Sequence, residues 1–194
     1  MAKLVDRLGP PELRPESDPE RYFARLVRAI VAQQLSARAA RTILDRVQAR
    51  LPDGLITPSG LASVGPEALR ACGLSGPKTR YVLALADGVA SGEIDLAALA
   101  HLADDEVAAR LTAIKGIGTW TAEMFLIFAL GRPDIMPLAD AGVRAAIRHA
   151  YRLDAPPTSD EMARLAEPWR PYRSFGAWYL WRSLDAPLPQ ATGS

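Results

Sequence analysis

The stretch Leu111-Thr-Ala-Ile-Lys-Gly-Ile-Gly-Thr-Trp-Thr-Ala122 decides the architecture of this chain. On its N-terminal side, Val107, Leu111 and Ile114 recur at helical spacing, which predicts an amphipathic helix. Two glycines then form a tight turn, and a second, more apolar helix begins at Gly118 or Thr119. Such a turn exposes backbone N–H groups at a helix N-terminus, where they can bind a phosphate. The alternative is an ordinary helix–helix turn with a glycine C-cap.

The composition indicates a soluble protein that folds without disulfides or a metal cluster. The chain has 194 residues and is 49% hydrophobic, enough for one domain or two small lobes. Its single cysteine, Cys72, excludes an internal disulfide and any four-cysteine iron–sulfur or zinc site. No apolar run reaches transmembrane length, and the N-terminus lacks the apolar core of a signal peptide. We therefore expect a cytoplasmic location, with the nucleoid if the source is bacterial, and no membrane partner.

The net charge of +1 is unevenly distributed along the chain. Residues 21–50 carry seven arginines and one acid, Asp45. A second row, formed by Arg144, Arg148 and Arg152, shares one helix face because its members are four residues apart. A solvated helix face is the usual meaning of such a row, and a stripe that faces phosphates is the alternative.

The pattern of apolar residues predicts an all-α fold. No period-2 strand pattern and no internal repeat is present, and short loops separate roughly ten helical segments. Among these segments are helices over 37–51, 120–130, 141–151 and 172–184. Residues 1–18 are rich in proline and charge and are predicted to be a loosely held lead-in.

Two aspartates after the glycine turn are candidate acids. Asp140 precedes the helix over 141–151, where an aspartate is most often an N-cap. The alternative is a functional carboxylate, because a helix N-terminus stabilises negative charge. Asp134 is the rival, but its position in the loop before Pro137 favours a structural role.

Four separated motifs resemble one family in the same order along the chain. They are Gln33-Gln-Leu-Ser36, L-x-x-I-x-G-I-G-x-x-T-A over 111–122, Pro137-Leu-Ala-Asp140 and Trp169-Arg-Pro-Tyr-Arg-Ser174. Together they resemble the helix-hairpin-helix DNA glycosylase superfamily and, within it, the 3-methyladenine DNA glycosylase II (alkylation repair) branch. The resemblance covers nearly the whole chain from about residue 20. Some members of this branch carry an additional N-terminal β-rich domain, and we expect none here because the sequence shows no strand pattern.

The resemblance implies a two-lobed fold. One lobe combines residues 1–34 with 133–194 and carries the catalytic aspartate. The other, residues 35–132, ends in the helix-hairpin-helix over 111–122, and the two lobes frame a cleft.

The resemblance also implies a monofunctional glycosylase that removes alkylated purines, such as 3-methyladenine and 7-methylguanine, from double-stranded DNA after base flipping. Asp140 then assists hydrolysis of the N-glycosidic bond. Trp120, Met124 and Tyr172 line the base pocket, where an aromatic face attracts a cationic base. Trp120 occupies the place of the catalytic lysine of the lyase members, and tryptophan cannot form a Schiff base. Trp178 and Trp181, at helical spacing, are expected to be core residues.

The implied partner is duplex DNA, and no cofactor is required. The expected monomer would grip one strand through the hairpin, while a residue of the 33–36 motif fills the gap left by the flipped nucleotide; Gln34 and Leu35 are the candidates. A structural Na⁺ or K⁺ is implied at the backbone carbonyls of the hairpin. The DNA-contacting residues are Lys115, Gly116, Gly118, Thr119, Gln34, Leu35 and Ser36, and the cation ligands are the carbonyls of Thr112, Ile114 and Ile117.

Two alternatives remain open from the sequence. A helix-hairpin-helix protein that binds DNA without catalysis would account for the glycines and arginines, but not for Asp140 together with the aromatic residues. A glycosylase for oxidised or deaminated bases would share the fold, and its lyase form would need an amine nucleophile.

Overall fold

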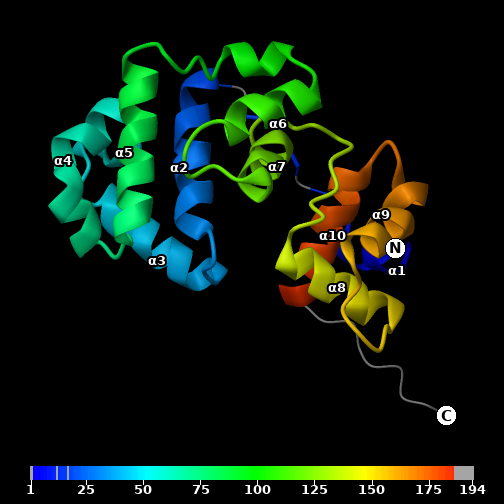
Figure 1. The fold of residues 1–194 in the computed structure, drawn as a ribbon. Coiled ribbons are helices and arrows are strands. Elements are labelled where there is room, and N and C mark those ends of the chain that lie inside the picture. Colours follow the sequence, from blue (N-terminus) through cyan, green and yellow to red (C-terminus); the bar gives the residue numbers. More distant parts are fainter. Residues whose placement is uncertain (1, 12, 17, 186–194) are drawn as a thin grey trace. The chain divides into compact units, whose positions relative to one another are not determined.

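The computed structural model describes residues 2–11, 13–16 and 18–185, and in these ranges the chain is helical without a β-strand (Figure 1). This confirms the all-α prediction. No helix of the described part is both long enough and apolar enough to cross a bilayer. The helices are α1 (Ala2–Leu8), α2 (Tyr22–Ala32), α3 (Ala37–Gln48), α4 (Pro58–Ala71), α5 (Gly76–Ala90), α6 (Asp104–Thr112), α7 (Thr119–Phe128), α8 (Ala141–Tyr151), α9 (Ser159–Ala166) and α10 (Arg173–Asp185). Short 3₁₀ turns lie at Pro19–Arg21, Pro52–Gly54, Ala98–His101 and Glu167–Trp169.

The chain forms two compact units. The central unit is Pro15–Leu130, and the terminal unit combines the residues up to Arg14 with those from Gly131 onward. The boundaries expected from the sequence, 34/35 and 132/133, differ from these at α2. This helix lies in the central unit because it packs against α3, α5 and α7, which all belong to residues 15–130.

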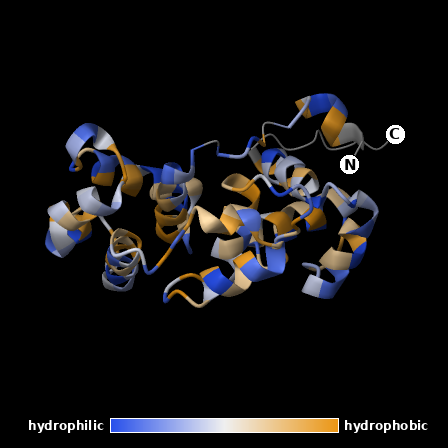
Figure 2. Cartoon of the chain, turned by 90° about the horizontal axis from the view of Figure 1, so that it is seen from above, coloured by the Kyte–Doolittle hydropathy of each residue, from blue (hydrophilic) through white to orange (hydrophobic). Residues whose placement is uncertain are grey.

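The core of the central unit is built around α2. Its apolar residues recur every three or four positions, so they form one continuous face. At the start of this face, the Tyr22 ring meets the edge of Phe125 from α7, with ring centroids 5.4 Å apart. Each fully buried side chain of this size contributes about 1.5–3 kcal/mol relative to its exposed state. Figure 2 shows the same alternation of hydrophobic and hydrophilic residues along the helices. The residues on this face that are at most 2% exposed are Phe23, Leu26, Val27, Ile30 and Val31.

The terminal unit has its own core between α8 and α10, formed by residues such as Val143, Ile147 and Leu180. The segment predicted to be a loose lead-in contains α1, which packs against α10. Leu4 is buried, and the Tyr179 hydroxyl donates to the Gly9 carbonyl at 2.7 Å. The prediction was wrong for residues 2–8 because these contacts come from a helix about 170 residues further along the chain.

Most helix starts follow from the local sequence. The side chains of Ser36, Ser75 and Thr158 accept from backbone amides at the starts of α3, α5 and α9. At Gly65, a φ of +75° interrupts α4, which therefore consists of two helical pieces.

Candidate functional site

A tight turn over residues 113–118 joins α6 to α7. The amide of Ile114 donates to the Leu111 carbonyl at 3.0 Å, and the amide of Ile117 donates to the Ile114 carbonyl at 3.0 Å. Lys115 lies in this turn and is exposed. The helix-hairpin-helix expected from the sequence is thus present. We call residues 113–118 the hairpin.

The two glycines of the hairpin have different roles. Gly116 has a φ of +94°, and a Cβ at this position would overlap the Tyr81 ring of α5. Gly118 has an ordinary φ of −96°, is exposed, and has no atom within 4 Å of its would-be Cβ. Gly116 is therefore required for packing against α5, whereas Gly118 leaves space for an incoming molecule.

The start of α7 is suited to an anion. Gly118 is the N-cap of α7 and has no side chain that could accept from the first amides of the helix. Thr119, the first residue of α7, is exposed beside it. The helix dipole and the outward-pointing amides both favour a negatively charged group at this end.

The turn between α2 and α3 is connected to the hairpin by the side chain of Gln33. Its amide nitrogen donates to the Gly116 carbonyl at 3.0 Å and to the Thr121 hydroxyl at 2.8 Å. Gln34, the next residue, has a left-handed φ of +56°, and Leu35 is 40% exposed. Gln34, Leu35 and Ser36 were predicted for this site from the sequence, but Gln33 was not, because its partners lie more than 80 residues away.

Asp140 is a buried carboxylate at the N-terminus of α8. It is 7% exposed, and its Oδ1 atom accepts from the Val143 amide at 2.7 Å and from the Trp181 indole at 3.0 Å. The N-cap interpretation is therefore correct, and it does not exclude a second role. Trp181 was expected to be a core residue only. It also orients this carboxylate, which no sequence signal had indicated.

Asp134, the rival acid, is held by two arginines. Its carboxylate accepts from Arg173 at 2.7 Å and from Arg170 at 2.9 Å, and its backbone carbonyl accepts a further bond from Arg173. The hydrogen bond from Arg173 lowers the pKa of Asp134 below its usual value, and desolvation opposes this only in part. Asp134 therefore ties its loop to the start of α10, in agreement with the structural role expected for it.

The residues predicted to line a base pocket belong to both units. Trp120 and Met124 are one helical turn apart on α7 in the central unit, and Met124 is buried. Tyr172 lies in the terminal unit just before α10, is 61% exposed, and packs against the Phe175 ring at 6.0 Å. These three assignments stay predictions.

The arginine row on α8 serves the fold. Arg144 donates to the carbonyls of Pro157 at 2.7 Å and Leu138 at 3.0 Å. Arg148 donates to the carbonyl of Asp154 at 2.9 Å. These bonds hold the loops on either side of α8, so the alternative of a phosphate-facing stripe is not supported for these two side chains.

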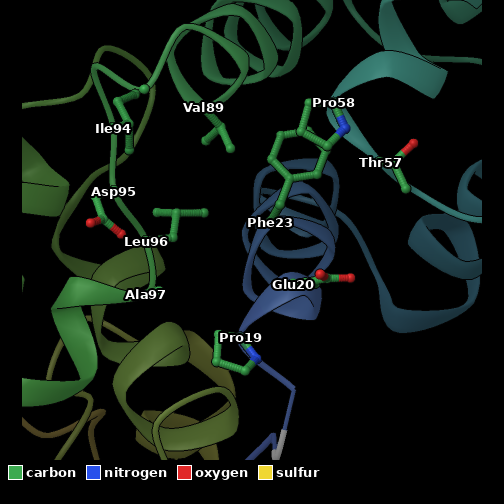
Figure 3. Close-up of a pocket in the computed structure, with 11 residues that line it drawn as sticks. Pro19, Glu20, Phe23, Thr57, Pro58, Val89, Ile94, Asp95, Leu96 and Ala97 are labelled. Carbon is green, nitrogen blue, oxygen red and sulfur yellow. The ribbon is translucent and has the colours of Figure 1, made fainter.

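A pocket of about 520 Å³ in the central unit does not match a base site. It is lined by Phe23, Pro58 and Ile94 and by the carboxylates Glu20 and Asp95 (Figure 3). Carboxylates repel the phosphates of a nucleic acid. Neither Trp120 nor Met124 lines this pocket.

The hairpin carbonyls remain the candidate ligands for a cation. The described residues contain no cluster of three or more His, Cys, Asp or Glu side chains that could hold a metal ion. Backbone carbonyls are hard oxygen donors that suit alkali and alkaline-earth cations. The Ile114 carbonyl accepts one bond, from Ile117, which leaves it one further lone pair.

The all-α fold and the hairpin between α6 and α7 define a DNA-repair protein of the helix-hairpin-helix class. The profile of the HhH-GPD superfamily of base excision DNA repair proteins matches residues 27–171, and the chain belongs to this superfamily.

Among its relatives, the chain is 36% identical to DNA-3-methyladenine glycosylase 1 of Schizosaccharomyces pombe over 185 residues, which are 94% of this chain and 80% of the relative. A putative DNA-3-methyladenine glycosylase of Bacillus subtilis is 36% identical over 82% of this chain and 58% of its own length. The structure superimposes on that of the S. pombe 3-methyladenine DNA glycosylase Mag1 in complex with abasic DNA with a TM-score of 0.86 and 35% identity, covering 96% of this chain and 91% of that one.

The contrast between the hairpin glycines provides a matched test. Gly116→Ala should lower the free energy of unfolding by about 2–5 kcal/mol, because it combines a left-handed φ with a clash against Tyr81. Gly118→Ala should change it by less than about 1 kcal/mol. Urea unfolding of both variants measures the difference. Equal stability of the two variants would contradict the packing described for Gly116.

The ion pairs of Asp134 predict a change in acid stability. Because its folded-state pKa lies below its usual value, its contribution is present above about pH 4 and is lost as the pH falls through the folded-state pKa. Asp134→Asn should therefore be less stable at pH 7 by about 1–2 kcal/mol and approach the wild type near pH 2–3. Urea unfolding across this pH range measures it, with the exposed Asp160→Asn as control. A stability difference that does not vary with pH would contradict the assignment.

Proposed function

We propose that this chain is a monofunctional DNA glycosylase that removes N-alkylated purines, such as 3-methyladenine and 7-methylguanine, from double-stranded DNA. The observation that carries the proposal is Asp140, a buried carboxylate whose Oδ1 atom is held by Val143 and Trp181. A carboxylate held by two donors keeps one orientation, which is a requirement for a group that stabilises a transition state.

The proposed reaction is hydrolysis of the N-glycosidic bond. As the bond between C1′ and the base nitrogen breaks, its electron pair leaves with the base, and positive charge develops on the deoxyribose. The Asp140 carboxylate stabilises this charge and orients or deprotonates the water that attacks C1′. The products are the free base and an abasic site. The water supplies the hydroxyl at C1′, and its remaining proton passes to the carboxylate or to solvent.

The choice of substrate follows from the base itself. A purine alkylated at N3 or N7 is cationic, which weakens its glycosidic bond and attracts it to an aromatic face. Trp120, Met124 and Tyr172 are the residues proposed to contact the base, and they supply an indole, a polarisable thioether and a phenol ring. Since a base inside the duplex cannot reach Asp140, the nucleotide must be extruded first.

The DNA-binding part of the proposal rests on the hairpin. The amides at the start of α7, next to Gly118 and Thr119, would bind a backbone phosphate, with Lys115 exposed beside them. Gln34 or Leu35 would fill the space vacated by the extruded nucleotide, and Ser36 would lie beside it at the N-terminus of α3. The relatives named above as 3-methyladenine glycosylases, and the Mag1 structure with abasic DNA, support this assignment.

We also propose that a monovalent cation binds at the carbonyls of Thr112, Ile114 and Ile117. When bound, it would add positive charge next to the phosphate-binding amides. It has no part in the chemical step.

Asp140→Asn gives the test of the function. Asparagine is as good an N-cap as aspartate and can still accept from Val143 and Trp181, so the fold should be retained. Without the negative charge, release of 3-methyladenine and 7-methylguanine from methylated duplex DNA should fall about 100-fold or more. Chromatography of the freed bases measures it.

Asp134→Asn is the control and should keep most of the release, because Asp134 is engaged with arginines. If base release survives in Asp140→Asn and is lost in Asp134→Asn, Asp134 would be the catalytic carboxylate and Asp140 the structural residue. If the wild type binds DNA but releases no base, a non-catalytic binding protein or another lesion class is favoured.

The residue at position 120 tests the lyase alternative. A glycosylase/lyase forms a Schiff base between an amine and the sugar, and borohydride reduces it to a stable protein–DNA adduct. With Trp120 at the position of the family's lysine, incubation with damaged duplex DNA and borohydride should give no adduct on a denaturing gel. A trapped adduct under conditions where bases are released would show that another amine acts as nucleophile.

A further inference from the structure

Three segments of the central unit meet in a short hydrogen-bonded chain that begins at Lys78. The ammonium group of Lys78, on α5, donates to the carbonyls of Val31 at 2.8 Å and Gln33 at 2.6 Å, at the C-terminus of α2. The Gln33 side chain in turn donates to the Gly116 carbonyl in the hairpin and to the Thr121 hydroxyl on α7. Lys78 thus connects α5, the end of α2 and the hairpin.

The placement of Lys78 does not serve its own helix. Lys78 is in the first turn of α5, after the N-cap Ser75, where a cation opposes the helix dipole. Burial also disfavours its charged form and lowers the pKa of Lys78. These costs are offset at the end of α2, where the last carbonyls lack intrahelical partners and attract a cation.

The bond to Gln33 acts on the turn that follows. The Gln33 carbonyl belongs to the peptide that leads into Gln34, so Lys78 fixes the orientation of that peptide. Gln34 has a φ of +56°, which is costly for a residue with a side chain and persists only where neighbouring contacts enforce it. A further bond closes the turn, from the Leu35 amide to the Ala32 carbonyl at 3.1 Å.

We propose that Lys78 and Gln33 are positioning residues that hold the turn over 34–36 and the hairpin as one DNA-engaging unit. The hairpin grips the backbone of the strand, and the turn fills the gap left by an extruded nucleotide. Both tasks concern the same strand, so the separation of the two segments must be constant to within a fraction of an ångström. Neither residue touches the reacting atoms. The proposal rests on the proposed glycosylase function. It identifies the residues that couple binding of the DNA backbone by the hairpin to extrusion of the nucleotide.

The test compares affinity for two duplexes, one undamaged and one carrying a tetrahydrofuran abasic-site analogue, in which the gap is already present. Lys78→Met removes the ammonium group and keeps the aliphatic stem. Its preference for the analogue over undamaged DNA should fall about tenfold relative to wild type, as expected for loss of bonds from a charged donor. Its affinity for undamaged DNA should change less than about threefold. Arg80→Met, two residues along α5 and exposed, removes the same charge and should leave the preference unchanged.

Gln33→Met supplies an independent arm, because it removes the bonds to the hairpin but keeps the carbonyls that Lys78 caps. It should lose the preference to a similar extent, and the double variant should lose little more than either single one. If Lys78→Met does not fold, this arm alone decides the proposal. Lys78→Arg, which retains the charge, should recover part of the preference.

The outcomes separate this proposal from the proposed function. A wild type that shows no preference for the analogue and releases no base would contradict both the positioning role and the proposed glycosylase function. In a second outcome, the wild type prefers the analogue, and Lys78→Met and Gln33→Met show the same preference and differ only in a lower melting temperature. This result would be consistent with the glycosylase function but would overturn the positioning role. An equal loss of affinity for both duplexes would assign Lys78 to a phosphate contact and likewise overturn it.

Discussion

The position of the hairpin depends on one close approach, that of the Gly116 backbone to the Tyr81 ring. Because no side chain lies between them, the hairpin rests directly on α5 and its backbone cannot shift inward. Gln33 also holds the hairpin, through its bond to the Gly116 carbonyl. With the hairpin held in this way, the amides at the start of α7 are presented outward by the fold and need no flexible side chain to bind an anion. In the proposed function, the backbone itself would form the phosphate-binding surface.

Two aspartates six residues apart show how environment separates two uses of the same side chain. Asp134 accepts from two arginines, so its charge is neutralised locally and it serves to anchor a loop. Asp140 accepts from a backbone amide and an indole, both uncharged donors. These two donors hold its Oδ1 atom in one orientation, as the proposed stabilisation of a developing positive charge requires. The difference lies in the partners supplied by α10, namely Arg173 for one and Trp181 for the other.

Sequence reasoning succeeded where a feature depends on neighbours within a few residues. The glycine turn before α7, the helix over 141–151 and its N-cap Asp140 depend on local sequence and were predicted correctly. It was wrong about α1, whose stability comes from α10 at the far end of the chain, and about the unit to which α2 belongs. It left open the purpose of the Arg144 row, because the carbonyls that receive those bonds lie in loops whose path only the folded chain defines.

By itself, the sequence determined the helical character, the glycine hairpin, the aspartate at the start of α8 and the family, because spacing, capping and motif residues are local properties. Only the tertiary structure decided which acid is engaged with arginines, that Trp181 orients Asp140, and that Lys78 and Gln33 connect α5 and α2 to the hairpin. These contacts join residues about 40 to more than 80 positions apart. Such pairs are selected by the packing of whole helices, and a single sequence carries no signal of which distant side chain will meet which.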